Sequence, residues 1–331
     1  MTDRVIDDVD IVPGTRISML DGELTVANPE TGRRFRVSAP AAHALLDDMV
    51  PDGLRPLGER PRDARTRAGV DHWVARGWDL CLDYYLASRG IVYADRADAD
   101  DSVRRGLMER AVADEPVPAR KDVPGDRIGL PPAGPLPARG LGEVLLGRRS
   151  VRRYRTGATT ADQVSQLLHH GLEPVRRLRD AVNTPLDLLL KSFGSAFDVY
   201  VACYDVNGIE RGVHYYDLAA HALVRLSEIP ELEQEDWFWG MPGPRTAAGT
   251  VVLVADFAQC SYRYPHERAL RDLYLEAGRI AQRLIVMAGY AGLGTVVTPA
   301  VRDTLVNARF GLDPAREAVV YTVTFGVDGR Q

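Results

Sequence analysis

Apolar positions recur with two different periods along this chain, and the period separates the strands from the helices that we expect. Runs of alternating or β-branched residues predict strands, whereas apolar residues three or four positions apart predict helices. In the C-terminal part, the pattern predicts helices over 161–171 and 266–290 and strands over 197–204, 213–216, 222–227, 249–256 and 318–326. The last strand is almost continuously apolar or β-branched, which is typical of a central strand. These elements predict an α+β fold, an α/β sandwich, over residues 141–331.

The first 113 residues predict a separate α+β module. Short strands are expected over 17–20, 24–27 and 34–37. Helices are expected over 38–49 and 66–88. Small strands combined with helices favour a winged-helix-like module, in which an edge strand beside a helix can accept an extended peptide. A dimer-packing appendage is an equal alternative.

Residues 114–140 differ from both flanking regions, because they contain seven prolines and show little apolar periodicity. Proline fixes one backbone dihedral and has no N–H to donate, so regular structure is disfavoured in such a segment. We expect a linker, or an arm laid over a surface. The expected organisation is therefore a module over 1–113, a linker over 114–140 and a second domain over 141–331.

Composition and charge narrow the function classes. At 331 residues and 45% hydrophobic content, the chain can bury the cores of two units. A net charge of −5 gives no general attraction to nucleic acid or to a membrane surface. The apolar runs are too short for a membrane span and the acidic start is unlike a signal peptide, so we expect a cytoplasmic protein. Three scattered cysteines predict neither a disulfide framework nor a metal site.

The densest group of chemically useful side chains is the stretch from Arg148 to Arg153. Four guanidinium groups and the hydroxyl of Ser150 fall within six residues. Arginine binds phosphate oxygens two at a time and stays charged at any working pH, so the stretch favours a site for a cofactor phosphate. A solvated basic turn is the alternative, because arginine is common throughout the chain and only Lys121 and Lys191 are lysines.

Three further segments carry candidate chemistry. Residues 288–295 form a glycine-rich turn, which lets backbone amides approach a planar ring or a phosphate closely. The turn lacks the strand-GxGxxG-helix order of a Rossmann site, so no NAD is expected. A β-hairpin is expected in which His214 and His221 are either structural or catalytic. The aromatic segment 236–242 is either a lid that stacks on a planar substrate or a core or dimer contact.

Taken in order, these segments resemble the nitroreductase-like flavoprotein superfamily, and most closely its SagB-type dehydrogenases, which oxidise azolines in ribosomally made peptides. The pattern of that family starts with Arg-Arg-Ser-x-Arg, which is matched at 148–152. A Gly-x-Tyr-x-Tyr-Asp strand follows and is matched at 212–217, with His214 in place of the first tyrosine. Glu-Ala-Gly-x-x-x-Gln on a helix and a Gly-Leu-Gly turn complete it, at 276–282 and 292–294. The first unit resembles the small N-terminal module often found on such enzymes.

The resemblance implies an FMN enzyme, usually a homodimer with the flavin between subunits, that acts on a modified precursor peptide and works beside a cyclodehydratase partner. It implies that the FMN phosphate and ribityl chain are held by Arg148, Arg149, Ser150 and Arg152. It implies that the flavin ring lies near Gly292, Leu293 and Gly294. Lys191 matches the lysine of the family and is the expected catalytic base. A free lysine has a pKa of about 10.4, so burial or nearby arginines must lower the pKa before it can act.

The chain departs from the family pattern beside the expected base. Ser192 stands where the family has tyrosine, and the loop that follows is shorter. Three hypotheses therefore stay open. The protein is an azoline dehydrogenase acting on a peptide, a flavin oxidoreductase acting on another small-molecule natural-product intermediate, or a non-catalytic subunit of the same fold that binds a peptide or an enzyme partner. Nucleic acid and membrane partners are not expected.

Overall fold

The computed structural model describes residues 5–6, 16–20, 23–27, 34–38, 73, 75–89, 102–190, 196–239 and 243–330. The chain divides into two compact units, Met1–Ala87 and Ser88–Gln331. The first unit contains a four-stranded sheet of order β1-β4-β3-β2, formed by β1 (Val5–Ile6), β2 (Arg16–Leu20), β3 (Glu23–Ala27) and β4 (Arg34–Val37). Strands β2, β3 and β4 confirm the three strands expected there.

Helices of the N-terminal region are only partly described. The helix expected over 38–49 lies, beyond Ser38, outside the described residues. Helix α3 (Asp79–Arg89) coincides with the end of the helix expected over 66–88. The winged-helix interpretation and the three-part domain organisation stay predictions.

The second unit is built on one seven-stranded sheet of order β10-β11-β9-β6-β7-β8-β5, in which all neighbouring strands are antiparallel. Its strands are β5 (Arg127–Gly129), β6 (Phe197–Cys203), β7 (Gly212–Asp217), β8 (Ala222–Ser227), β9 (Gly249–Asp256), β10 (Gly294–Thr298) and β11 (Glu317–Gly326). The five expected strands are confirmed to within one residue at each end. Strand β11 has a neighbour on both sides, as its continuous apolar sequence predicted.

The described helices of the second unit are α4 (Ser102–Asp114), α5 (Leu141–Gly147), α6 (Ala161–Gly171), α7 (Glu173–Asp180), α8 (Pro185–Leu190), α9 (Phe257–Arg263), α10 (Ala269–Tyr290) and α11 (Asp303–Phe310). Helix α6 begins at a capping box between Thr160 and Gln163, which satisfies two main-chain donors at the helix start. No helix in the described part of the chain combines the length and the apolar character needed to cross a membrane.

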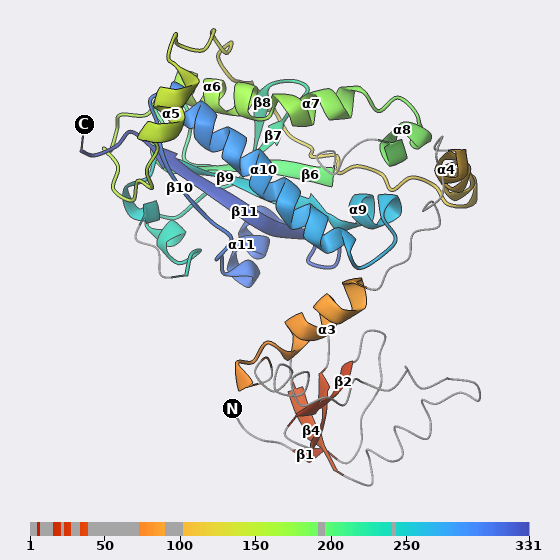
Figure 1. Ribbon diagram of the computed structural model, residues 1–331. Coiled ribbons are helices and arrows are strands. Elements are labelled where there is room, and N and C mark those ends of the chain that lie inside the picture. Colours follow the sequence, from red (N-terminus) through yellow and green to blue (C-terminus); the bar gives the residue numbers. More distant parts are fainter. Residues whose placement is uncertain are drawn as a thin grey trace. The chain divides into compact units, whose positions relative to one another are not determined.

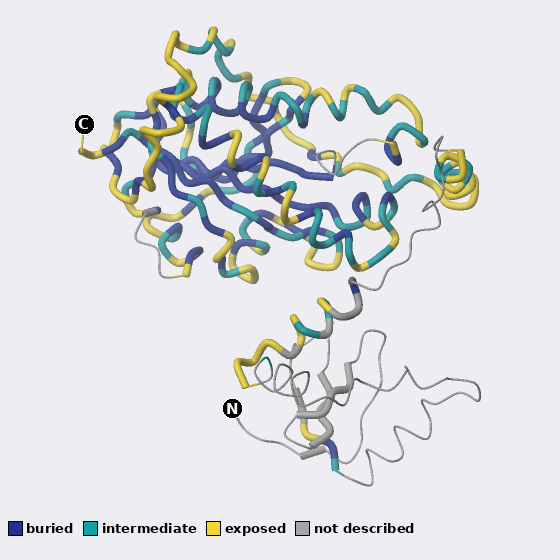
Figure 2. The backbone as a smooth tube through the Cα atoms, in the orientation of Figure 1, coloured by how far each residue is buried: buried dark blue, intermediate teal, exposed yellow. Residues whose placement is uncertain are grey.

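The central strands of the sheet alternate between two buried faces. In β6, Val199 and Val201 join the apolar cluster beneath α6 and α10, whereas Tyr200 and Ala202 join the cluster that includes residues of α11. This alternation follows the two-residue period of a strand. Figure 1 shows α10 lying across one face of the sheet, and Figure 2 shows that the central strands are buried along their length. The fold is therefore α+β with helices on both faces, which confirms the expected fold class.

Residues 115–131 form an anchored arm over the second unit. Strand β5 at the end of this arm pairs with β8 and extends the sheet by one strand. Upstream, the side-chain amide of Gln259 donates to the carbonyl of Pro118. Lys121 forms an ion pair with Glu317, with 3.0 Å between Nζ and Oε2. The proline-rich segment is thus held mainly by side chains from the sheet and helices, because its main chain makes few regular hydrogen bonds of its own.

The substitution Lys121→Met is expected to lower the free energy of unfolding by about 2 kcal/mol, because an unpaired buried charge is costly. The side chain of Glu317 is only 5% exposed and would lose its cation. Arg105→Met is the matched control, since Arg105 and Glu109 form an ion pair with side chains that are 62% and 55% exposed. Such exposed pairs contribute at most about 0.5 kcal/mol. Urea unfolding measures both variants, and equal losses would contradict the anchoring role of Lys121.

Candidate functional site

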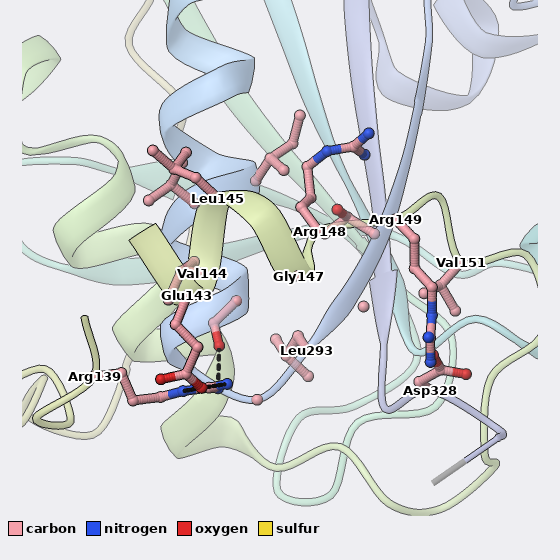
Figure 3. Close-up of a pocket in the computed structure, with 16 residues that line it drawn as sticks. Arg139, Glu143, Val144, Leu145, Gly147, Arg148, Arg149, Val151, Leu293 and Asp328 are labelled. Carbon is pink, nitrogen blue, oxygen red and sulfur yellow. Dashed lines mark hydrogen bonds and ion pairs between the residues drawn. The ribbon is translucent and has the colours of Figure 1, made fainter. Parts of the chain in front are cut away.

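A pocket with a volume of about 240 Å³ lies where α5 and the segment after it meet the end of α10 and the start of β10. Its lining includes Arg148 and Arg149 from that segment, and Gly292, Leu293 and Gly294 from the turn between α10 and β10 (Figure 3). These two groups are far apart in the sequence. The fold therefore brings the arginine stretch and the glycine-rich turn together at one site.

Glycines let α5 lie directly against the backbone of α10, and the arginine stretch against that of β10. A Cβ atom at Gly294 would lie 2.6 Å from Cγ2 of Val151, and one at Gly289 would lie 2.8 Å from Cγ1 of Val144. Gly292 has a φ of +75°, a left-handed conformation that commonly ends a helix and favours glycine. The space that a side chain at Gly294 would need is filled by Val151 of the same chain.

Main-chain hydrogen bonds hold the arginine stretch at the end of the sheet. The N–H of Val151 donates to the carbonyl of Thr295 at 2.9 Å, and Ser150 forms an isolated parallel bridge with the same residue. The Val151 side chain is buried, whereas the arginines on either side of it are exposed. The backbone is therefore fixed while the guanidinium groups remain accessible to a ligand.

Asp328 sets the charge at one end of the pocket. Its side chain is 6% exposed and accepts hydrogen bonds from Nη2 of Arg149 at 2.9 Å and from Nε of Arg330 at 3.3 Å. Burial alone would raise the pKa of Asp328, but the hydrogen bonds from Arg149 and Arg330 outweigh burial, and the pKa lies below its ordinary value. The carboxylate therefore stays ionised, and it fixes Arg149 without cancelling both arginine charges.

A second ion pair lies at the other end of the pocket. Nη2 of Arg139 lies 2.7 Å from Oε1 of Glu143, and Nη1 donates to the carbonyl of Gly289 at 3.2 Å. Figure 3 shows Arg148 between the two ion pairs, with its guanidinium directed away from both. Within the described residues, no hydrogen bond or ion pair engages the Arg148 side chain. The pocket thus offers a guanidinium that the described side chains leave unpaired, which suits an anionic ligand.

Sequence reasoning identified part of this lining. Of the residues expected around a cofactor, those that line the pocket are Arg148, Arg149, Gly292, Leu293 and Gly294. Ser150 and Arg152 lie beside the pocket and outside its lining. Arg139, Glu143 and Asp328 also line the pocket and were not predicted, because each stands outside any recognisable motif. The available signal was the position of Asp328 just after the last expected strand. That signal is useful only when the segments that lie beside the end of this strand are known.

The expected catalytic base, Lys191, lies outside the described residues. A buried arginine, Arg263, and a half-buried one, Arg179, hold the described chain before and after it. Nη1 of Arg263 donates to the carbonyl of Leu188 at 2.7 Å. Nη2 of Arg179 donates to the carbonyl of Phe197 and lies 2.8 Å from Oδ1 of Asp198. The main chain is therefore anchored by a cation on each side of the expected base.

His221 occupies a structural position. Its Nδ1 lies 2.7 Å from the hydroxyl of Tyr216, and its Nε2 lies 2.8 Å from Oγ of Ser165. The Ser165 hydroxyl also donates to the carbonyl of Pro131, so Nε2 of the histidine carries the proton and donates to Ser165. Burial lowers the pKa of His221 and of His214, which favours their neutral forms. Neither histidine lines the pocket, and this favours the structural alternative for both.

The aromatic segment contributes one buried and one exposed tryptophan. Trp237 is 2% exposed and packs in the core, whereas Trp239 is 59% exposed. The guanidinium of Arg302 lies 4.7 Å from the ring centre of Trp239, whose Nε1 donates to the carbonyl of Val301 at 3.1 Å. Residues 240–242 lie outside the described residues. Trp237 therefore acts as a core residue, and Trp239 is available for contact with a substrate or a partner.

The residues of the pocket fit the phosphate end of FMN. The arginine stretch supplies more guanidinium groups than the carboxylate of Asp328 can neutralise. One of them, that of Arg148, has no partner among the described residues. Sites for whole drug-sized ligands measure about 300–1,000 Å³. A volume of about 240 Å³ therefore accommodates one end of such a cofactor. The donor chemistry and the size both agree with a phosphate group and the atoms next to it.

The sequence profile of the nitroreductase family matches residues 145–327, a range that contains most of the pocket lining. The chain is 26% identical to the trifolitoxin operon protein TfxC of Rhizobium leguminosarum bv. trifolii, over 88% of this chain and 83% of that protein. It is 22% identical to the trifolitoxin-processing protein TfxB of the same organism, over 84% and 77% of the two chains. A protein of Methanocaldococcus jannaschii that is named as a nitroreductase is 30% identical, over 50% of this chain and 82% of that one.

The substitution Gly294→Ala is expected to lower the free energy of unfolding by about 1–3 kcal/mol, as overpacking does in well-packed regions. The new methyl group would overlap Val151. The double variant Gly294→Ala/Val151→Ala removes both crowding methyl groups of Val151 and leaves only the Cβ of residue 151, at 2.9 Å, so it should lose less than the sum of the two single variants. Gly106→Ala in α4 is the control, because its methyl group would come no closer than 3.8 Å to a flexible arginine side chain. Thermal or urea unfolding that leaves Gly294→Ala as stable as the natural protein would rule out this close packing.

Proposed function

The chain belongs to the nitroreductase family, and on that premise we propose that it is an FMN-dependent dehydrogenase that oxidises azoline rings to azoles in a modified peptide. The observation that carries the proposal is the pocket at which Arg148 presents a guanidinium that no residue in the described part of the chain engages. The motifs of the SagB-type pattern support a peptide substrate, and so does similarity to a protein named for trifolitoxin processing. Family membership points to an oxidoreductase. The azoline substrate and the dehydrogenase reaction are the part that we propose beyond family membership.

In this proposal, Arg148 and Arg149 hold the FMN phosphate, with Ser150 and Arg152 contributing from the same stretch. Asp328 already holds Arg149 in place, so less side-chain entropy is lost when this residue binds the ligand. The turn from Gly292 to Gly294 forms the pocket wall next to the arginines, and its backbone would lie near the flavin ring. Bound FMN would supply an acceptor for two electrons.

Aromatisation of an azoline removes a proton from one ring carbon and a hydride from its neighbour. We assign proton removal to Lys191, whose amine must be neutral to act as a base. Neighbouring cations disfavour a charged ammonium group. Arg263 is 9% exposed and bonds the carbonyls of Leu188 and Leu189, and the chain reaches Lys191 two residues later. This buried cation supports the assignment.

Oxidation or reduction of a small planar molecule is the second candidate function. Trp239 favours it, because an exposed indole held by Arg302 and by the carbonyl of Val301 is a rigid surface for stacking. The serine at position 192, where the family has tyrosine, also favours a changed reaction. A non-catalytic subunit that binds a peptide or an enzyme such as a cyclodehydratase is the third possibility, and absence of FMN binding would favour it.

A homodimer is part of the proposal. Leu141, Leu145 and Leu146 of α5 are 56%, 45% and 91% exposed. Exposed apolar groups mark interaction surfaces when they gather on one element, as these do. A second copy of the chain is the partner that the family resemblance implies, and sedimentation of the purified protein at micromolar concentration tests for it.

Arg148→Gln is expected to weaken FMN binding about ten- to a hundredfold, the range for losing one or two hydrogen bonds to a charged group. Quenching of flavin fluorescence during titration of the protein measures the dissociation constant. Arg177→Gln in α7 is the control, because this arginine is 80% exposed and pairs with Glu173 outside the pocket lining. Equal affinities for all three proteins would contradict the placement of the phosphate beside Arg148.

Azoline oxidation is tested with an azoline-containing peptide and a panel of small planar substrates. The natural protein should convert the peptide, with a loss of two mass units for each ring oxidised. Lys191→Ala should keep bound flavin but reduce turnover by about a hundredfold or more, in line with the contribution of a general base. Turnover of a small molecule with none on the peptide would favour the second candidate, and unchanged turnover in Lys191→Ala would remove Lys191 from the mechanism.

A further inference from the structure

Tyr154 lies directly after the arginine stretch and connects it to the end of the last strand. The residue is 5% exposed, and its main chain forms an antiparallel bridge with Asp328. The N–H of the next residue, Arg155, donates to the carbonyl of Val327 at 2.9 Å. Asp328 also binds the side chain of Arg149. The arginine stretch is therefore tied to the segment 327–329 by main-chain hydrogen bonds and by a side chain.

The ring of Tyr154 rests on a position that has no side chain. A Cβ atom at Gly326 would lie 2.9 Å from Cδ1 of the tyrosine. Gly326 is also the register partner of Gly294 in the pairing of β10 with β11, and Gly294 is the glycine that receives Val151. The two glycines thus form a glycine platform, Gly294 and Gly326, on which Val151 and Tyr154 rest side by side.

The hydroxyl of Tyr154 closes a loop within the arginine stretch. It donates to the carbonyl of Val151 at 2.6 Å, and Arg152 and Arg153 lie within this loop. Burial raises the pKa of the Tyr154 phenol well above its ordinary range, so the hydroxyl remains a donor at any working pH. The N–H of Val151 is already bonded to Thr295. Both main-chain polar groups of Val151 are therefore fixed.

We propose that Tyr154 is a positioning residue for anion binding, whose hydroxyl sets the main-chain geometry from which Arg148 and Arg149 reach a ligand phosphate. This inference rests on the proposed function, because it takes the pocket beside those arginines as the FMN phosphate site. Tyr154 does not line the pocket and acts through Val151, which does. Removing the hydroxyl leaves the ring on the glycine platform but frees the carbonyl of Val151 and the loop that it closes.

The test compares Tyr154→Phe with Tyr204→Phe. Tyr204 is a matched control, because it is 6% exposed, belongs to the same apolar cluster and donates its hydroxyl to Oγ1 of Thr250 at 3.0 Å, outside the pocket lining. Tyr154→Phe loses the bond to Val151 and a longer contact, 3.4 Å, of the same hydroxyl with the carbonyl of Thr324, and Tyr204→Phe loses its bond to Thr250. Because each variant removes one buried donor, both should shift the urea midpoint by a similar amount. Tyr154→Phe alone should weaken FMN binding, by roughly five- to tenfold, as measured by flavin fluorescence and by competition with inorganic phosphate.

The outcomes separate the inference from the proposed function. Natural protein that binds FMN, a weakened Tyr154→Phe and an unaffected Tyr204→Phe would support the positioning role. If the natural protein and Tyr154→Phe bind FMN equally well, the positioning role is overturned and the proposed function stands. Equal weakening in both variants would also overturn it, because a general loss of stability would then explain the effect. Failure of the natural protein to bind FMN would overturn both proposals.

Discussion

The candidate site depends on how closely one extended segment lies on the backbone beneath it. Gly289, Gly294 and Gly326 each leave a space, which is filled by a side chain of α5, of the arginine stretch and of Tyr154 respectively, at distances that leave no room for a Cβ atom. Protein interiors are packed as densely as organic crystals, so a contact of this kind cannot be relaxed by a small local adjustment. Because Gly294 and Gly326 are paired across β10 and β11, the sheet register places both spaces side by side. The position of the guanidinium groups follows from that register.

Arginines in this chain are distinguished by their partners more than by their number. Arg263 is buried and Arg179 is half-buried, and both bond main-chain or carboxylate groups within the unit, so their charges serve the fold. Arg149 is shared between Asp328 and the pocket. Arg148 is exposed at the pocket, and no described residue pairs with it. Nearly all basic residues of this chain are arginines, so the sequence alone does not show which of them bind a ligand. The hydrogen-bond partners in the structure separate a structural arginine from one that can bind a ligand.

Long buried strands and the two amphipathic helices were predictable from the sequence, because their apolar periods persist over enough residues to be recognised. Short helices such as α7 and α9 were not, since seven or eight residues carry little periodicity and depend on tertiary packing. The glycine-rich turn was located correctly, but the reason for its glycines was not. Gly292 ends a helix and Gly294 receives Val151, and the second role depends on a contact between segments that no local pattern reveals. Asp328 was missed for the same reason.

The charges around the pocket favour a dianion over a monoanion. Arg139 and Glu143 cancel each other. Arg149, which lines the pocket, and Arg330, which lies outside its lining, both pair with the ionised carboxylate of Asp328, and Arg148 lines the pocket with no partner among the described residues. Three cations and one anion leave an excess of two positive charges. A phosphate monoester loses its second proton at a pKa of about 6 and is therefore mostly a dianion at neutral pH. A carboxylate or a phosphodiester would neutralise only half of the excess, so the local charge favours a terminal phosphate as the group that the arginine stretch binds.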